Sequence, residues 1–253
     1  MPVSALKGFN VVEATPGFSG YQGPSLLQIL EHLPATAAET TQPFAFPVQW
    51  VEKFSGSSDT SQGRRVFWGR VATGGVQAGQ SITVLPSGQT AKVAQVLDHA
   101  RRPTAILAGH SAGIVLDREV DVSRGDWLLA HLEPTAAAGD DGQAEAAPFQ
   151  PQREIQATVA WMDDEPLVAG RAYWALHGHR WVKAKVRRIV HKLNINTLAE
   201  EEATQLDPNA IGHIELMLQE PLATLPYAQS RLLGSLILVD TASHKTSAAV
   251  LVR

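Results

Sequence analysis

The sequence contains no cysteine. Disulfides, thiolate metal ligands and cysteine nucleophiles are therefore excluded, and nothing in the composition calls for an oxidising compartment, so we expect a cytoplasmic location. The sequence also has no apolar run near the roughly 20 residues that a bilayer-spanning helix needs. Its first residues lack the basic and then apolar order of a signal peptide. We therefore expect no export and no membrane partner.

An excess of positive charge is also missing. The 21 Lys and Arg residues face 25 Asp and Glu residues, which gives a formal net charge of -4. A dedicated nucleic-acid binder normally needs a basic surface, so the charge disfavours nucleic acid as a partner. With 253 residues, of which 44% are hydrophobic, the chain is long enough for two ordinary domains that each bury a core.

Two breaks in the hydrophobic pattern divide the chain. Residues 133–151 are rich in Pro, Ala, Gly and Asp, and they predict a flexible linker over 134–150. A shorter break at 34–43 separates an N-terminal segment from the rest. We therefore expect an N-terminal segment with its linker at 1–42, a first domain at 43–133 and a second domain at 151–253.

The N-terminal segment contains one predicted helix, over residues 24–33. Gly23 can cap it, Pro24 suits its first turn, and Pro34 stops it. Four leucines fall on one face of this helix: Leu26, Leu27, Leu30 and Leu33.

After residue 43 the pattern changes to short alternating runs separated by Gly and Pro turns, which is typical of strands. The runs predict strands near 46–50, 65–73, 81–85, 90–97, 112–116 and 127–131, and then near 154–161, 171–176, 181–190, 210–218, 234–240 and 247–252. A slip of the apolar phase at Arg187 and Arg188 predicts a bulge, and 196–206 fits either a short helix or an extended excursion. Because no helical crossovers separate the runs, we expect an all-β fold of two small antiparallel barrels.

No complete catalytic or metal site is expected in this chain. His177 and His179 flank a glycine at a predicted hairpin tip, and no third ligand stands at metal-ligand spacing from them. No Gly-x-Ser-x-Gly elbow is present to activate a serine. The acidic run Asp163-Asp164-Glu165 precedes a proline and predicts a solvated turn.

One stretch concentrates positive charge, and it contains Arg180, Lys183, Lys185, Arg187, Arg188 and Lys192. Trp181 lies within it, as in a strand that binds RNA. The favoured interpretation is a solvated strand face, because Lys183 and Lys185 share one side of an alternating strand and the glutamates at 200–202 can neutralise them.

Several segments together resemble a known family. Residues 63–76, GRRVFWGRVATGGV, and residues 121–127, DVSRGDW, are similar to the second-domain barrel of translation-factor GTPases. A finer resemblance is to the large GTPase subunit of bacterial sulfate adenylyltransferase, or ATP sulfurylase. It is carried by 21–27 (YQGPSLL), 84–88 (VLPSG), 194–198 (NINTL), 209–212 (NAIG) and 234–240 (GSLILVD), and so extends over nearly the whole chain.

The resemblance implies barrels of the domain II and domain III type. It also implies that Ser4, Ala5 and Leu6 are the remnant of a guanine-contacting loop at the end of a GTPase domain. In the family the large subunit binds GTP and Mg²⁺, and it helps a smaller adenylyl-transferring subunit to make adenylyl sulfate from ATP and sulfate. The smaller subunit and the parent GTPase domain are thus the implied partners.

The phosphate-binding motif Gly-x-x-x-x-Gly-Lys-Ser/Thr does not occur in this sequence. We therefore expect no bound cofactor in this chain, no activity of the chain alone, and a start inside the GTPase domain. Two other functions stay open. The barrels could belong to a fragment like a translation elongation factor that binds tRNA or ribosome, or they could form a stand-alone interaction module.

Overall fold

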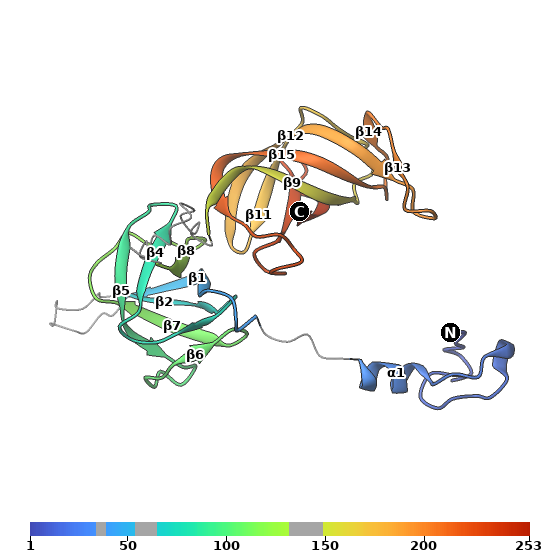
Figure 1. Cartoon of the computed structure of the whole chain (residues 1–253), viewed down its shortest axis with the longest axis horizontal. Coiled ribbons are helices and arrows are strands. Elements are labelled where there is room, and N and C mark those ends of the chain that lie inside the picture. Colours follow the sequence, from blue (N-terminus) through green and yellow to red (C-terminus); the bar gives the residue numbers. More distant parts are fainter. Residues whose placement is uncertain (34–38, 54–64, 132–148) are drawn as a thin grey trace, which may run out of the picture. The chain divides into compact units, whose positions relative to one another are not determined.

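The computed structural model describes residues 1–33, 39–53, 65–131 and 149–253. The chain forms two compact units, Met1–Ala38 and Glu39–Arg253, which Figure 1 colours along the sequence. The boundary between the units falls inside the predicted break at 34–43. Most of the predicted linker lies outside the described residues.

The N-terminal unit contains a short 3-10 turn, η1 (Phe18–Gly20), and one helix, α1 (Leu26–His32). The prediction that Gly23 caps the helix is wrong, because the N-cap is Ser25. The Ser25 hydroxyl accepts a hydrogen bond from the Gln28 backbone N–H, and the Ser25 N–H donates to the Gln28 side chain. This reciprocal capping box satisfies two backbone donors, and a glycine at the N-cap, having no side chain, would offer no acceptor to the Gln28 N–H. The four predicted leucines of the helix are exposed.

Six strands of the first barrel close on one another in the order β1-β2-β7-β5-β4-β8. Their bounds are β1 (Ala45–Lys53), β2 (Arg65–Arg70), β4 (Ser81–Leu85), β5 (Thr90–Leu97), β7 (Ser111–Leu116) and β8 (Trp127–Ala130). All these pairings are antiparallel. A separate two-stranded ladder joins β3 (Gly75–Val76) to β6 (Ile106–Leu107). Alternate side chains fill the barrel, among them the fully buried Phe46, Ile82 and Ile114.

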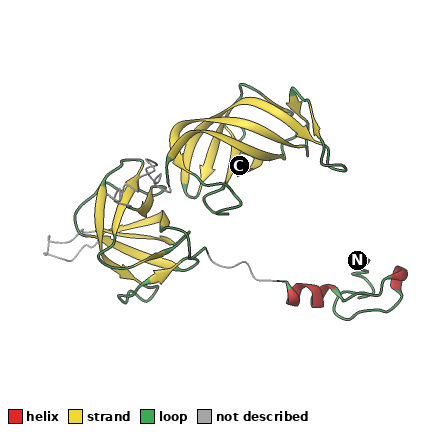
Figure 2. Ribbon diagram, in the orientation of Figure 1, coloured by secondary structure: helices red, strands yellow, loops and turns green. Residues whose placement is uncertain are grey.

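The second sheet has the order β11-β16-β17-β9-β15-β12-β13, and an additional β11–β12 pairing joins its first strand to its sixth. Six antiparallel strands therefore form a closed circuit, shown in yellow in Figure 2, to which β13 is attached through β12. The bounds are β9 (Pro151–Trp161), β11 (Ala172–His177), β12 (Arg180–Leu193), β13 (Glu200–Glu201), β15 (Ile211–Ala223), β16 (Ser235–Asp240) and β17 (Thr246–Val252). A two-stranded ladder pairs β10 (Leu167–Val168) with β14 (Gln205–Leu206).

The core of the second sheet is built around two aromatic rings. Trp161 and Tyr173 are almost completely buried and meet edge to face, with ring centroids 5.7 Å apart. The Trp161 indole N–H donates to the Glu165 carbonyl at 2.7 Å, so the polar edge of the ring is also satisfied.

The predicted all-β fold is confirmed. The runs at 81–85 and 90–97 coincide with β4 and β5, and the register of β12 against β15 shifts between Val186 and Arg188, where the bulge was predicted. Residues 196–206 are not helical, and they carry the short strands β13 and β14. Within the described ranges, the structure has no helix that is both long and apolar enough to cross a membrane.

Candidate functional site: the loop, the junction and the outer face

The predicted guanine-loop remnant is a tight turn at the start of the chain. The Ser4 N–H donates to the Phe9 carbonyl at 3.1 Å, which closes the turn. The Ser4 hydroxyl accepts from the Lys7 N–H at 3.4 Å. Ala5 and Leu6 lie within the turn, and the Leu6 side chain is 96% exposed. The structure thus places Ser4, Ala5 and Leu6 together in one turn, with Ala5 and Leu6 exposed and Ser4 half-buried, and their contact with guanine stays a prediction.

The basic stretch on β12 is neutralised by acidic residues of β9 and β15 and by Asp126, which immediately precedes β8. Its ion pairs are Arg180 with Asp126 and Glu220, Arg187 with Glu154, and Arg188 with Glu215. Lys183 lies over the Trp174 ring instead, 5.4 Å from its centroid. The predicted solvated face is therefore correct for Lys183 and Lys185, which are exposed. Among the described residues no ion pair joins Lys183 or Lys185 to the glutamates at 200–202, and Glu200 instead contacts His191.

The start of β8 in the first barrel meets the β11–β12 hairpin of the second sheet at a contact that we call the junction. The junction is defined by five residues: Asp126, Trp127, His177, Gly178 and Arg180. Arg180 Nη1 lies 2.9 Å from Asp126 Oδ1, and the two side chains are only 19% and 12% exposed. Burial raises the pKa of Asp126, against the opposing effects of a hydrogen bond from the Ser123 N–H and of the Arg180 charge. The pair is therefore a desolvated one, in which each charge depends on the other.

Aromatic stacking forms the apolar half of the junction. Trp127 and His177 stack with ring centroids 5.0 Å apart and an angle of 22° between the rings. Gly178 turns the β11–β12 hairpin with a φ of 59°, and a Cβ there would lie 2.8 Å from the Trp127 ring. Glycine is thus required here both for its backbone conformation and for the close approach of Trp127.

His177 is completely buried in the junction. Its Nε2–H donates to the Leu233 carbonyl at 3.1 Å, because a carbonyl can only accept. No partner for Nδ1 exists among the described residues, although this atom is buried. Burial lowers the pKa of His177 to about 4, and the hydrogen bond to Leu233 opposes the shift only in part. The ring is therefore neutral at pH 7, with its proton on Nε2.

The acidic run at 163–165 is a turn, as predicted, and two of its carboxylates are tied down. Asp163 accepts a hydrogen bond from the Ser247 hydroxyl at 2.6 Å, which is the main cause of its lowered pKa. Arg171 bridges Glu165 and Asp240, at 2.8 Å from each. These bonds fasten the turn to the end of the sheet, which is a structural role.

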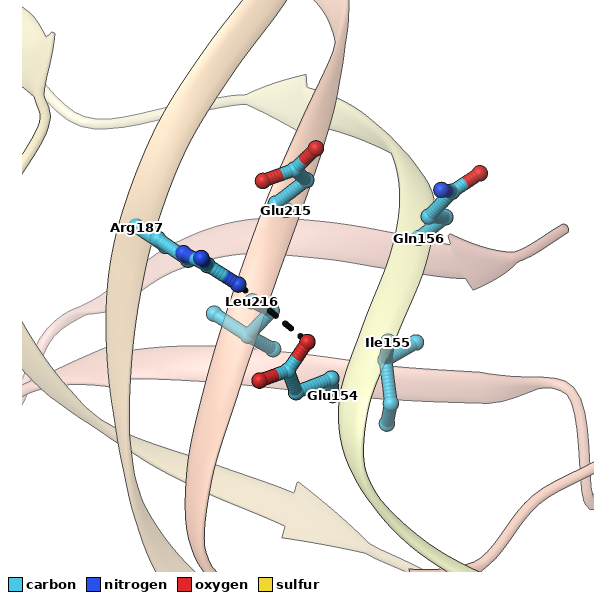
Figure 3. Close-up of a pocket in the computed structure, with 6 residues that line it drawn as sticks. All are labelled: Glu154, Ile155, Gln156, Arg187, Glu215 and Leu216. Carbon is cyan, nitrogen blue, oxygen red and sulfur yellow. Dashed lines mark hydrogen bonds and ion pairs between the residues drawn. The ribbon is translucent and has the colours of Figure 1, made fainter.

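The outer face of β9, β12 and β15 carries a row of polar side chains. A cavity of about 180 Å³ lies there, lined by Glu154, Ile155, Gln156, Arg187, Glu215 and Leu216. Figure 3 shows Glu154 and Arg187 joined by an ion pair of 3.2 Å beside Glu215. Charges of both signs at this exposed site favour polar contacts and leave little apolar surface for a drug-sized ligand.

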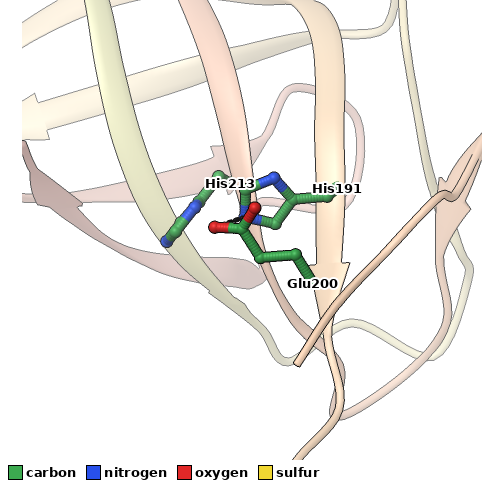
Figure 4. A group of neighbouring side chains, drawn as sticks. All are labelled: His191, Glu200 and His213. Carbon is green, nitrogen blue, oxygen red and sulfur yellow. Dashed lines mark ion pairs between the residues drawn. The ribbon is translucent and has the colours of Figure 1, made fainter. Parts of the chain in front are cut away.

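The same face brings together His191 on β12, His213 on β15 and Glu200 on β13 (Figure 4). The sequence pattern singled out neither histidine, and it indicated Glu200 only as a counter-charge for the basic stretch. The imidazole rings of His191 and His213 lie 4.3 Å apart, edge to face. Glu200 Oε1 lies 3.2 Å from His191 Nε2. Burial, Arg253 and His191 lower the pKa of His213 in that order, so its ring is neutral at pH 7. Sequence spacing gave no signal for this cluster, since its assembly depends on strand register.

Comparison with known proteins shows where this architecture occurs. Residues 154–253 match the family model described as GTP-eEF1A C-terminal domain-like. The structure of sup35 complexed with GDP superposes on this chain with a TM-score of 0.69, and the match covers 100% of this chain and 57% of the sup35 chain. Because the two sequences are only 21% identical, this likeness shows the fold alone. The chain thus has the two-barrel architecture of the translation-factor GTPases.

Curated relatives are more similar in sequence. Sulfate adenylyltransferase subunit 1 of Laribacter hongkongensis is 34% identical over 253 residues, which is 100% of this chain and 49% of the relative. The bifunctional enzyme CysN/CysC of Xylella fastidiosa is 36% identical over 249 residues, which is 98% of this chain and 37% of that enzyme. The chain is therefore a homologue of bacterial sulfate adenylyltransferase subunit 1. The chain spans about half the length of subunit 1 and 37% of the bifunctional enzyme.

Proposed function

We propose that this chain is the two-barrel region of a GTP-dependent sulfate adenylyltransferase large subunit. In this role it docks the smaller adenylyl-transferring subunit and the parent GTPase domain, and so supports the formation of adenylyl sulfate from ATP and sulfate. The chemistry resides in those two partners, and GTP and Mg²⁺ bind to the GTPase domain. A cytoplasmic location follows from this metabolic role.

The observation that carries the proposal is the similarity to sulfate adenylyltransferase subunit 1 along the whole chain, at 33% to 34% identity in two of its relatives. The junction supports a docking role, because the Arg180–Asp126 pair and the Trp127–His177 stack join the two barrels within one compact unit. Barrels that are joined by such contacts have less freedom to lose when they bind a partner, which lowers the entropic cost of association.

Binding of GTP by the chain alone is the first test. Isothermal titration with GTP and Mg²⁺ is expected to show no binding, because the turn at Ser4, Ala5 and Leu6 supplies no lysine–glycine cradle for phosphates. Micromolar affinity for GTP would contradict the assignment of the nucleotide site to a separate domain.

Co-purification with the smaller subunit is the second test. The tagged chain is expected to retain the separately expressed smaller subunit of sulfate adenylyltransferase on a column, since the barrels hold the docking surface. Aminoacyl-tRNA serves as the competing ligand in a parallel arm. Retention of aminoacyl-tRNA without the smaller subunit would overturn the proposal and favour a role like that of an elongation factor, for which the match of residues 154–253 to the GTP-eEF1A C-terminal domain-like model is the supporting observation.

A further inference from the structure

We propose that His191, His213 and Glu200 form a binding site for Zn²⁺ on the outer face of the second sheet. Each residue offers one ligand atom, and the three ligand atoms lie within 4.8 Å of one another. Figure 4 shows the side chains converging from three strands. Two imidazoles and a carboxylate form a donor set that favours Zn²⁺ over the harder ions Mg²⁺ and Ca²⁺. Three protein ligands leave the fourth position of a tetrahedral zinc ion open.

The sheet itself builds the site. His191 and His213 are direct cross-strand partners in the β12–β15 ladder, so their side chains leave the same face of the sheet. On the other side of β12, Glu200 pairs with Leu193, which is two positions from His191 and shares its face. Glu200 therefore reaches His191 along the diagonal. Backbone hydrogen bonds fix both histidines, while the Glu200 side chain is 64% exposed and free to adjust.

The cluster leaves ligand capacity unused. His191 Nε2 is buried, and within the described part of the chain no group makes a well-directed hydrogen bond to it, although Glu200 Oε1 lies 3.2 Å away. A buried nitrogen without a hydrogen bond costs free energy, and coordination of a metal ion removes that cost. Tetrahedral zinc places its ligand atoms about 3.3 Å apart. The most widely separated ligand atoms therefore have to approach by up to about 1.5 Å, which rotation of Glu200 and of the two rings can provide.

Arg253 is the group with which a metal ion must compete. Its Nη1 lies 2.7 Å from His213 Nδ1, and since a guanidinium has no acceptor it must donate to that nitrogen. The cluster thus already attracts one cation through a lone pair of His213. Zn²⁺ replaces the guanidinium at the imidazole, and the displaced Arg253 side chain moves into solvent. Binding also ties β13, and with it the excursion between β12 and β15, to the sheet.

Titration of the metal-free chain with ZnCl₂ tests the site, by calorimetry and by competition with a chromophoric chelator. We expect one zinc ion per chain, no heat from Mg²⁺ or Ca²⁺, and slower amide exchange at residues 194–206 when zinc is present. His213→Gln and Glu200→Gln are each expected to weaken binding at least about tenfold. Glu201→Gln is the matched control, because this neighbouring glutamate instead accepts a hydrogen bond from Asn194, and it should leave zinc affinity unchanged.

Arg253→Ala separates a metal site from a simple hydrogen-bonded cluster. Removing the competing cation is expected to tighten zinc binding at least about threefold, because a guanidinium repels a nearby dication. Circular dichroism of each variant confirms that it is folded. The proposal is overturned if the folded chain, at about 10 μM, binds no zinc in the presence of a roughly 100-fold excess of ZnCl₂. It is equally overturned by binding that the His213 and Glu200 variants leave unchanged, since the chain has nine histidines.

Discussion

Replacing Arg180 by alanine is expected to lower the free energy of unfolding by about 2–4 kcal/mol. The change removes the partner of Asp126, whose side chain is only 12% exposed, and leaves its carboxylate desolvated at the junction. Glu220, which Arg180 also binds, loses a contact at the more exposed rim. Urea denaturation at pH 7, followed by circular dichroism, measures the difference from the unmodified chain.

Arg187→Ala is the matched control for this prediction. Arg187 lies on the same strand and also forms an ion pair, with Glu154, but the two side chains are 57% and 65% exposed. An exposed pair contributes about 0–1 kcal/mol, so this variant should stay close to the unmodified chain. Equal effects of the two substitutions would mean that the burial of the Arg180–Asp126 pair does not matter for stability. The Arg180→Ala deficit should also shrink in acid, because Asp126, whose pKa burial already raises, takes up a proton there.

Local patterns predicted the strands well, because the alternation of side chains across a strand is written directly into the sequence. The run at 81–85 alternates residues such as Ile82 and Val84, which the barrel buries, with residues that it leaves half-buried. The slip at Arg187 and Arg188 was readable for the same reason, since a bulge changes the phase of the alternation. The helix start was readable too, but Ser25 and Gln28, three positions apart, were the better signal than Gly23.

Contacts between distant residues were not predictable from spacing. Asp126 and Arg180 are 54 positions apart, and their meeting depends on how the β11–β12 hairpin lies against the end of β8. The zinc candidates needed two registers, that of β12 with β15 and that of β12 with β13. A shift of one residue in either register would send a side chain to the opposite face. The sequence analysis considered His177 and His179 as possible metal ligands. These two residues flank the Gly178 turn, and His177 is completely buried.

The stability of the chain is expected to fall as the pH is lowered from 7 to 5, with about 2 kcal/mol of the loss due to His177. The folded chain holds the pKa of this imidazole at about 4, against 6.5 for the free side chain. Below pH 6.5 His177 is protonated in the unfolded chain but stays neutral in the folded chain, so lowering the pH favours unfolding. The contribution is complete above the unfolded pKa and is lost between pH 6.5 and about 4.

His177→Phe isolates this contribution, because phenylalanine can still stack on Trp127 but has no proton to gain. The variant loses the hydrogen bond to Leu233, which lowers its stability by a similar amount at every pH. Between pH 7 and pH 5 the free energy of unfolding should therefore fall by about 2 kcal/mol less in the variant than in the unmodified chain. Burial also lowers the pKa values of His179 and His213, so a residual slope in the variant is expected. An unchanged slope would show that protons reach His177 without unfolding, and hence that the junction opens while the barrels stay folded.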